Sequence, residues 1–179
     1  MYSHIVFDRD GTLIEFVNYL SAPNKVSLVM GVVEVFKELK KRKIKLFLHT
    51  NQSGVARGYF TIDDVHKCNN RMLDLIGLGY DVFEDICIAT DLKVSNITYR
   101  KPSSLFGKEI LNKYQINKTD LLYVGDTITD LETAKNIGCD AFGVNYGKYD
   151  LSEKLKSRQD LSYKVFNSFT QIGKEILLK

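Results

Sequence analysis

The chain has 179 residues, of which 44% are hydrophobic and 26% charged, and its formal net charge at pH 7 is +3. This balance is typical of a globular protein with a core of its own, which excludes a disordered chain and a disulfide-dependent miniprotein. So small a positive charge suits an anionic metabolite but does not by itself indicate nucleic-acid binding.

Cysteine usage and hydropathy indicate a cytoplasmic protein. The three cysteines, Cys68, Cys87 and Cys139, are scattered and contain no Cys-x-x-Cys pair, so we expect them to be reduced. No apolar run approaches membrane-spanning length, and charged residues interrupt the only candidate signal segment near the N-terminus. We therefore expect a cytoplasmic protein without a membrane partner.

Strand-like and helix-like segments alternate along the whole chain. The apolar runs predict strands at residues 4–8, 45–50, 83–89, 121–125 and 141–144. Helical spacing and capping signals predict helices at residues 31–43, 61–77, 105–114, 130–137 and 168–179. This order predicts an α/β fold, a Rossmann-like parallel sheet with helices on both faces, in a single domain of residues 1–179.

The first predicted strand ends in Asp-Arg-Asp-Gly-Thr at residues 8–12. Residues two apart share a face of a strand, so Asp8 and Asp10 reach the crevice at the carboxyl ends of parallel strands. Gly11 allows a sharp turn, and the Thr12 hydroxyl is available to orient a carboxylate. Two close carboxylates require a cation such as Mg²⁺ between them, although an Asp-Gly turn after a strand is also common without one.

The second strand runs into Thr50-Asn51-Gln52-Ser53-Gly54. A hydroxyl and successive backbone amides at the start of a loop can hold phosphate oxygens. Arg57, further along this loop, adds a planar fork for phosphate. The same residues are also compatible with an ordinary polar loop.

Two more polar clusters follow later in the chain. Lys101, in Arg100-Lys101-Pro102, could neutralise charge that develops during phosphoryl transfer, although most lysines are simply solvated. Asp126 and Asp130 follow the fourth strand and could complete an acidic site for a hard cation. Asp130 could equally be an ordinary N-terminal residue of the next helix.

The order of these clusters resembles the haloacid dehalogenase-like phosphohydrolases over nearly the whole chain. The resemblance implies that Asp8 is the nucleophile and Asp10 the general acid and base, while Thr50 and Lys101 bind the phosphoryl group. It also implies a Mg²⁺ ion on Asp8, the backbone carbonyl of Asp10 and Asp126, with Asp130 close by. The spacing between the motifs leaves no room for a large cap domain, so we expect an open site narrowed only by residues 18–28 and 91–99.

Finer matches resemble the heptose-bisphosphate and histidinol-phosphate phosphatases, which implies a sugar-phosphate substrate. By this resemblance Arg57 and Arg100 contact the rest of the substrate, and Thr12, Asn51 and Gln52 belong to the binding site. Those subgroups usually carry a zinc loop just before Arg-Lys-Pro. Residues 87–99 here contain one cysteine and no histidine, so a local four-ligand zinc site cannot form. Tyr99, in place of the last cysteine, could be a packing residue or a substrate wall.

The sequence leaves two other functions to consider, a polynucleotide 3′-phosphatase and a non-enzymatic binding module. The 3′-phosphatase domains of polynucleotide kinases share several of these motifs, but the chain has no kinase P-loop and no basic stripe. A non-enzymatic binding module would be expected to lose Asp8 or Asp10, and both are present. We expect a small phosphorylated metabolite as the partner, no nucleic acid, and a monomer or small homo-oligomer. His49 alternates with Thr50 along its strand and should be structural.

Overall fold

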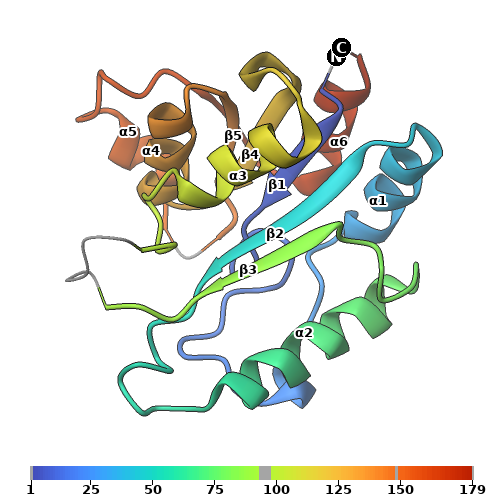
Figure 1. The fold of residues 1–179 in the computed structure, drawn as a ribbon, viewed down its shortest axis with the longest axis vertical. Coiled ribbons are helices and arrows are strands. Elements are labelled where there is room, and N and C mark those ends of the chain that lie inside the picture. The colour runs from blue at the N-terminus through green and yellow to red at the C-terminus, as the bar shows by residue number, and fades with distance from the viewer. Residues whose placement is uncertain (1, 93–97, 148, 179) are drawn as a thin grey trace.

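The computed structural model describes residues 2–92, 98–147 and 149–178, and in these ranges a parallel sheet forms the centre (Figure 1). Its order is β3-β2-β1-β4-β5-β6. The strands are β1 (His4–Phe7), β2 (Lys45–Asn51), β3 (Asp85–Ala89), β4 (Leu121–Gly125), β5 (Asp140–Val144) and β6 (Lys164–Phe166). Because β1 pairs with both β2 and β4, the loops after these three strands meet at one edge of the sheet.

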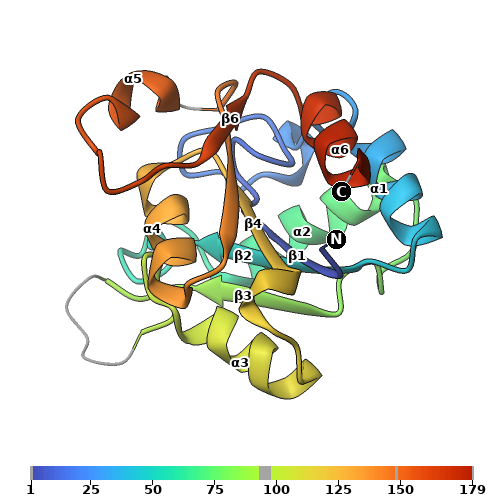
Figure 2. The same cartoon turned by 90° about the horizontal axis from the view of Figure 1, so that it is seen from above.

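Helices cover both faces of the sheet (Figure 2). They are α1 (Val32–Lys41), α2 (Ile62–Ile76), α3 (Leu105–Tyr114), α4 (Ile128–Ile137), α5 (Leu151–Leu155) and α6 (Phe169–Leu178). One face carries α1, α2 and α6, and the other carries α3, α4 and α5. The predicted fold class is therefore confirmed. Among the described residues, no helix combines the length and the apolar character that crossing a membrane requires.

The two faces have separate hydrophobic cores because side chains alternate along the strands. Phe7 of β1 packs against Phe36 of α1 and Phe169 of α6, with ring centroids 5.2 and 5.7 Å apart. Val6, the preceding residue, belongs to the opposite cluster with Phe106 of α3. β1 is thus buried on both sides, and its end is held firmly at the edge where the polar loops meet.

The predicted elements are present with shifts of at most two residues at their ends, and the larger differences have local causes. α4 begins at Ile128 rather than at residue 130, because Thr127 is its N-cap and forms a capping box with Asp130. β3 begins at Asp85, two residues later than predicted. The last predicted helix ends at Leu178, and Lys179 lies outside the described residues.

Two short elements were not predicted from the sequence, β6 and α5. β6 has three residues and is only partly buried at the sheet edge, so it has no clear hydrophobic alternation. α5 has five residues and begins at an Asp150 N-cap in a polar segment, which is too short for helical periodicity.

The long connection from β1 to α1 contains no inserted domain within the described residues. It runs through isolated bridges that join Ile14 to Asp10 and to Leu28, and through a 3₁₀ turn at Pro23–Lys25. Between the end of β1 and the start of α1, the described chain therefore holds these bridges and one 3₁₀ turn.

Candidate active site

A buried lysine joins two carboxylates, one at the end of β1 and one in the first turn of α4. Lys101 Nζ donates to Asp8 Oδ1 and to Asp130 Oδ1, each at 2.5 Å. Asp8 follows directly after β1, and its backbone N–H donates to Val124 O of β4 at 2.8 Å. Asp8 is 7% exposed, Lys101 4% and Asp130 1%. Their charges therefore interact with little screening by solvent.

Burial and crowding control the ionisation of this group. Burial raises the pKa of Asp8 well above its usual range; Lys101 opposes this shift, while the nearby Asp130 and Asp126 carboxylates add to it. Burial alone would lower the pKa of Lys101, but the Asp130 and Asp8 carboxylates outweigh it and raise that pKa. The lysine is therefore positively charged at neutral pH and is the built-in counter-charge of the cluster.

Three carboxylates are close enough to share a metal ion. Asp8, Asp126 and Asp130 each offer an oxygen, and these oxygens lie within 4.8 Å of one another. Backbone packs directly against Asp126, since a Cβ added at Gly11 or Gly147 would lie 2.4 or 2.3 Å from its Oδ2. This all-oxygen donor set fits a hard cation such as Mg²⁺. The Asp10 side chain is not in this cluster, and its expected carbonyl ligand remains a prediction.

The Asp10 carboxylate is held by three side chains. Gln52 Nε2 donates to Asp10 Oδ2 at 2.8 Å, and Thr50 Oγ1 donates to the same oxygen at 3.3 Å. Arg9 donates from Nε to Oδ2 at 3.0 Å and from an Nη2 amine to Oδ1 at 3.1 Å. The Asp10 side chain is 18% exposed, so the carboxylate remains accessible from one side.

Asn51 links the end of β2 to the lysine loop. Its side-chain amide donates to Lys101 O at 3.2 Å, and its Oδ1 accepts from the Lys101 backbone N–H at 2.9 Å. This two-point contact fixes the backbone from which the Lys101 side chain extends. Asn51 also lines both cavities described next, so it both supports the loop and faces solvent space.

Two adjoining cavities open at this edge of the sheet. The acidic cavity, of about 150 Å³, is lined by residues that include Asp8, Asp10, Lys101, Asp126 and Asp130. The outer cavity, of about 300 Å³, is lined by residues that include Asp10, Phe16, Tyr19, Asn51, Phe60 and Arg100. Asp10, Phe16 and Asn51 line both. Asp10 thus stands between the charged cluster and a larger, mixed polar and aromatic space.

The structure brings most of the predicted site residues to these cavities, but not all. Arg100 lines the outer cavity, and one of its guanidinium nitrogens is buried without a hydrogen-bond partner among the described residues. Arg57 is exposed and lines neither cavity. Thr12 is fully buried, and its hydroxyl likewise has no described partner and reaches neither cavity. This geometry gives no support to Arg57 or Thr12 as substrate ligands.

Of the two segments expected to narrow the site, only residues 18–28 line the outer or the acidic cavity among the described residues. Asn18, Tyr19 and Leu20 line the outer cavity. Of residues 91–99, those the structure describes line neither cavity, and residues 93–97 lie outside the described ranges. Tyr99 instead donates its hydroxyl to Glu109 at 2.7 Å, which favours the packing role for this residue.

His49 is structural, as its strand position predicted. It is fully buried on the face opposite Thr50, and its ring nitrogens contact Tyr123 Oη at 2.5 Å and Tyr99 O at 2.8 Å. Burial, with Lys101 nearby, lowers the pKa of His49 to about 3. It therefore stays neutral at ordinary pH and does not face either cavity.

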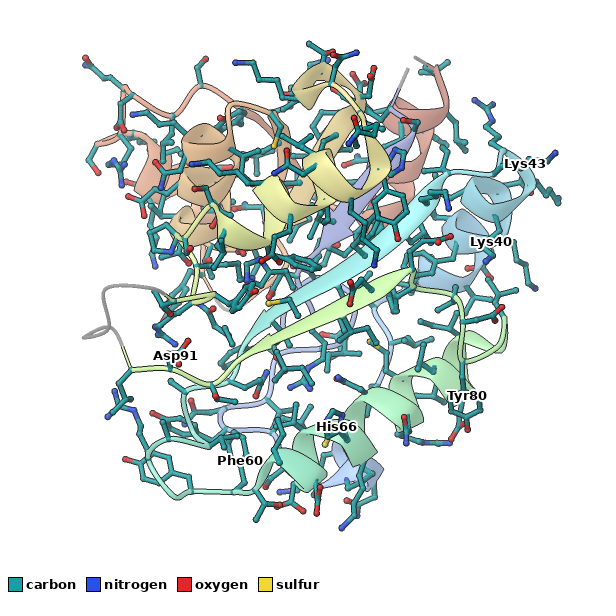
Figure 3. All side chains as sticks on the ribbon, viewed as in Figure 1. Lys40, Lys43, Phe60, His66, Tyr80 and Asp91 are labelled. Atoms are coloured by element: carbon teal, nitrogen blue, oxygen red, sulfur yellow. The ribbon has the colours of Figure 1, made fainter. Side chains whose placement is uncertain are left out.

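Figure 3 shows that two labelled lysines, Lys40 and Lys43, lie far from the site. Lys40 lies at the C-terminal end of α1 and Lys43 just after it, whereas Phe60, which lines the outer cavity, lies in the loop after β2 at the far side of the molecule. Sequence reasoning missed Phe16 and Phe60 as lining residues, and it missed Arg9 as a partner of Asp10. The spacing of Arg9 between two aspartates was the only available signal.

Comparisons with known proteins agree with this geometry. The profile of the haloacid dehalogenase-like hydrolases matches residues 14–144. The chain is 28% identical over 146 residues to a D-glycero-D-manno-heptose-1,7-bisphosphate 7-phosphatase of Thermosynechococcus vestitus, which covers 75% of this chain and 74% of that protein. It is 29% identical over 136 residues to the histidine biosynthesis bifunctional protein HisB of Legionella pneumophila; the match covers 75% of this chain but only 39% of HisB.

A solved structure has the same fold over the full chain. The D,D-heptose 1,7-bisphosphate phosphatase from B. bronchiseptica, crystallised with magnesium and phosphate, superposes with a TM-score of 0.86. The match covers 99% of each chain at 23% identity. At this identity the likeness concerns the arrangement of strands and helices.

Proposed function

This chain belongs to the haloacid dehalogenase-like hydrolase family and is a phosphatase, and we propose that it hydrolyses a sugar phosphate through a phosphorylated Asp8. The observation that carries the proposal is the placement of Asp8. It lies at the end of β1, bonded to Lys101, beside two further carboxylates and next to Asp10 across one cavity. A covalent intermediate on a carboxylate divides one difficult displacement into two easier ones.

In the first proposed step, an Asp8 carboxylate oxygen attacks the phosphorus and the bond to the leaving oxygen breaks. Asp10, as the carboxylic acid, gives its proton to that leaving oxygen, so the product departs as an alcohol. Lys101 balances the negative charge on Asp8 and on the phosphoryl oxygens. The fully buried Thr50 donates its single hydroxyl proton to Asp10 Oδ2, and in this step that donation would switch to a phosphoryl oxygen.

In the second proposed step, water attacks the phosphorus of the aspartyl-phosphate. The bond from phosphorus to the Asp8 oxygen breaks, which regenerates the Asp8 carboxylate and yields inorganic phosphate. Asp10, now the carboxylate, takes the proton of the water and returns to its acid form. Each turnover thus consumes one water and leaves both carboxyl groups as they began.

We propose that Asp8, Asp126 and Asp130 hold or support a Mg²⁺ ion, with the Asp10 backbone carbonyl as a further ligand. The close approach of the three carboxylate oxygens and the backbone packed around Asp126 support this choice. When bound, the ion would neutralise charge on the phosphoryl oxygens and help to align them with Asp8. In the described residues, no His/Cys cluster offers a competing zinc site.

Heptose 1,7-bisphosphate is the first substrate to test, because the Thermosynechococcus relative is named for it. The outer cavity offers polar groups and aromatic rings next to Asp10, and Arg100 is among its lining residues. Histidinol phosphate is the second candidate, since the match to HisB covers three quarters of this chain. We expect the protein to act in the cytoplasm as a monomer or small homo-oligomer.

A hydrolysis panel with Mg²⁺ tests this proposal. It should include heptose 1,7-bisphosphate, histidinol phosphate, other sugar phosphates and a 3′-phosphorylated oligonucleotide, with phosphate release measured as kcat/KM. The proposal expects the highest value on a sugar phosphate. A clear preference for the oligonucleotide would replace the proposed substrate class, and no hydrolysis of any phosphomonoester would refute the proposed activity.

A further inference from the structure

Arg9 is a fully buried arginine between the two aspartates of the site. Its relative exposure is 0%, and it is the largest of the fully buried side chains among the described residues. Nε and an Nη2 amine both bond to the Asp10 carboxylate, at 3.0 and 3.1 Å, and Nη1 donates to Asn69 Oδ1 at 2.8 Å. Each of the three guanidinium nitrogens therefore donates a hydrogen bond to Asp10 or Asn69.

Burying the positive charge of Arg9 costs free energy, and its ion pair with Asp10 offsets that cost. Transfer of a cation from water to a protein interior costs several kcal/mol, on the order of what a good ion pair and its hydrogen bonds restore. The carboxylate paired with Arg9 in the structure is Asp10. A residue needed only for packing at this position would be apolar, so the guanidinium serves the carboxylate that it binds.

The two oxygens of Asp10 have different surroundings. Oδ2 accepts from Arg9 Nε, from Gln52 Nε2 at 2.8 Å and from Thr50 Oγ1 at 3.3 Å, and Arg9 Nη2 also lies 3.0 Å from it. Oδ1 accepts, among the described residues, only from Arg9 Nη2. A protonated oxygen keeps one in-plane lone pair, so Oδ1 can carry a proton and still accept this bond. Oδ1 is thus the oxygen with room to exchange a proton with a molecule in the cavity.

A bidentate contact fixes the plane of a carboxylate, which a single bond cannot do. If Arg9 were removed, Gln52 and Thr50 would still hold Oδ2, but the carboxylate could rotate about that oxygen and move Oδ1. Arg9 itself is anchored by α2, because its Nη1 donates to the Oδ1 of Asn69, a residue of α2 that is 3% exposed. A chain of contacts therefore runs from α2 through Arg9 to the orientation of Asp10.

We propose that Arg9 is a positioning residue, anchored by Asn69, which orients Asp10 so that Oδ1 exchanges the proton with the leaving oxygen of the substrate. This inference rests on the proposed role of Asp10 in phosphomonoester hydrolysis. It adds a residue that touches neither substrate nor metal in the proposed reaction, and it names the oxygen that transfers the proton.

The test compares leaving groups. An alkyl phosphate needs its leaving oxygen protonated, whereas an activated aryl phosphate needs little help. The parameter is kcat/KM, because it reports only the steps up to transfer onto Asp8. The variants are Arg9→Met, which removes the fork, Arg9→Lys, which keeps a charge without the fork, and Asn69→Leu, which removes the anchor. Arg71→Met, at an exposed arginine on the same helix as Asn69, is the matched control.

We expect Arg9→Met to lose about 10²-fold in kcat/KM on the alkyl phosphate and less than about 10-fold on the aryl phosphate, a share of the ~10²–10⁴-fold value of acid–base catalysis. Arg9→Lys should show a similar contrast because orientation, not charge, is lost. Asn69→Leu should show the same direction with a smaller contrast, and Arg71→Met none.

Parallel losses on both substrates in Arg9→Lys and Asn69→Leu would overturn the inference, as would an Arg9→Lys that behaves like the unchanged protein. Asn69→Leu decides the question if the Arg9 variants do not fold, which their circular dichroism spectra will show. Asp10→Asn separates this result from the proposed function. If Asp10→Asn shows the leaving-group contrast and the Arg9 and Asn69 variants do not, only the positioning role fails; if Asp10→Asn shows none, the role of Asp10 fails first.

Discussion

Replacing Lys101 with methionine should destabilise the chain far more than the loss of an ordinary ion pair. Lys101 Nζ lies 2.5 Å from both Asp8 and Asp130, and the lysine side chain is only 3% exposed. Removing one partner of a buried charge pair costs about 3–5 kcal/mol, because the remaining charges are left buried and uncompensated. For a chain of this size, that corresponds to a fall in Tm of roughly 6–20 °C.

The pH dependence of this loss has a definite sign. Lys101 is the neighbour that lowers the pKa of Asp8, so in the variant that pKa lies still further above its usual range. A carboxyl group with a raised pKa in the folded state contributes stability at low pH and loses it as the pH rises through the folded pKa. The deficit of Lys101→Met should therefore be larger at about pH 8 than at about pH 5.

Urea and thermal unfolding of the metal-free protein at both pH values would measure the effect. Lys135→Met is the control, since the Lys135–Asp160 pair is 2.7 Å long but its side chains are 47% and 43% exposed. An exposed pair of this kind is worth about 0–1 kcal/mol. Equal losses in Lys101→Met and Lys135→Met, or a deficit that shrinks as the pH rises, would refute the electrostatic account of the cluster.

Three further predictions test other parts of the account. Asp8→Asn should abolish turnover while its Tm in the metal-free protein stays level or rises, because a buried, crowded carboxylate is removed; residual turnover near the original rate would count against Asp8 as the nucleophile. Chelation should stop turnover, Mg²⁺ should restore it, and elemental analysis should find no stoichiometric zinc; a tightly bound zinc with a large fall in Tm on chelation would contradict this. Thr61→Ala should cost about 1 kcal/mol by removing the N-cap of α2, and an unchanged Tm would show that the capping box does not contribute.

The sequence predicts the meeting of Asp8, Asp126 and Asp130 because short-range rules are sufficient for it. Asp8 and Asp126 directly follow apolar strands, and Asp130 lies in the first turn of the helix after β4. Parallel strands bring their carboxyl ends, and the helix starts that follow them, to one edge. Lys101 is different, since it does not follow a strand directly. Its position depends on the contacts of its backbone with Asn51, and the family resemblance rather than the spacing indicated its role.

The parts of the site that were not predicted depend on long-range packing. The path of the connection after β1 places Phe16 at the outer cavity, and no periodicity in the sequence encodes that path. Arg57 carries a guanidinium group, which commonly binds phosphate, but its side chain lies exposed on the loop after β2. Arg9 shows the reverse, because an arginine beside two aspartates suggests a solvated surface residue, whereas the fold buries it completely.

The central claim is that the phosphoryl group is transferred to Asp8, and trapping the intermediate tests it most directly. The protein should be mixed with an aryl phosphate and Mg²⁺, quenched in acid during turnover, reduced with borohydride and mapped by peptide mass spectrometry. Reduction converts an aspartyl-phosphate to homoserine, so the account predicts homoserine at position 8, dependent on substrate and absent in Asp8→Asn. Turnover without any modification at position 8, or modification of another carboxylate such as Asp126 or Asp130, would contradict it.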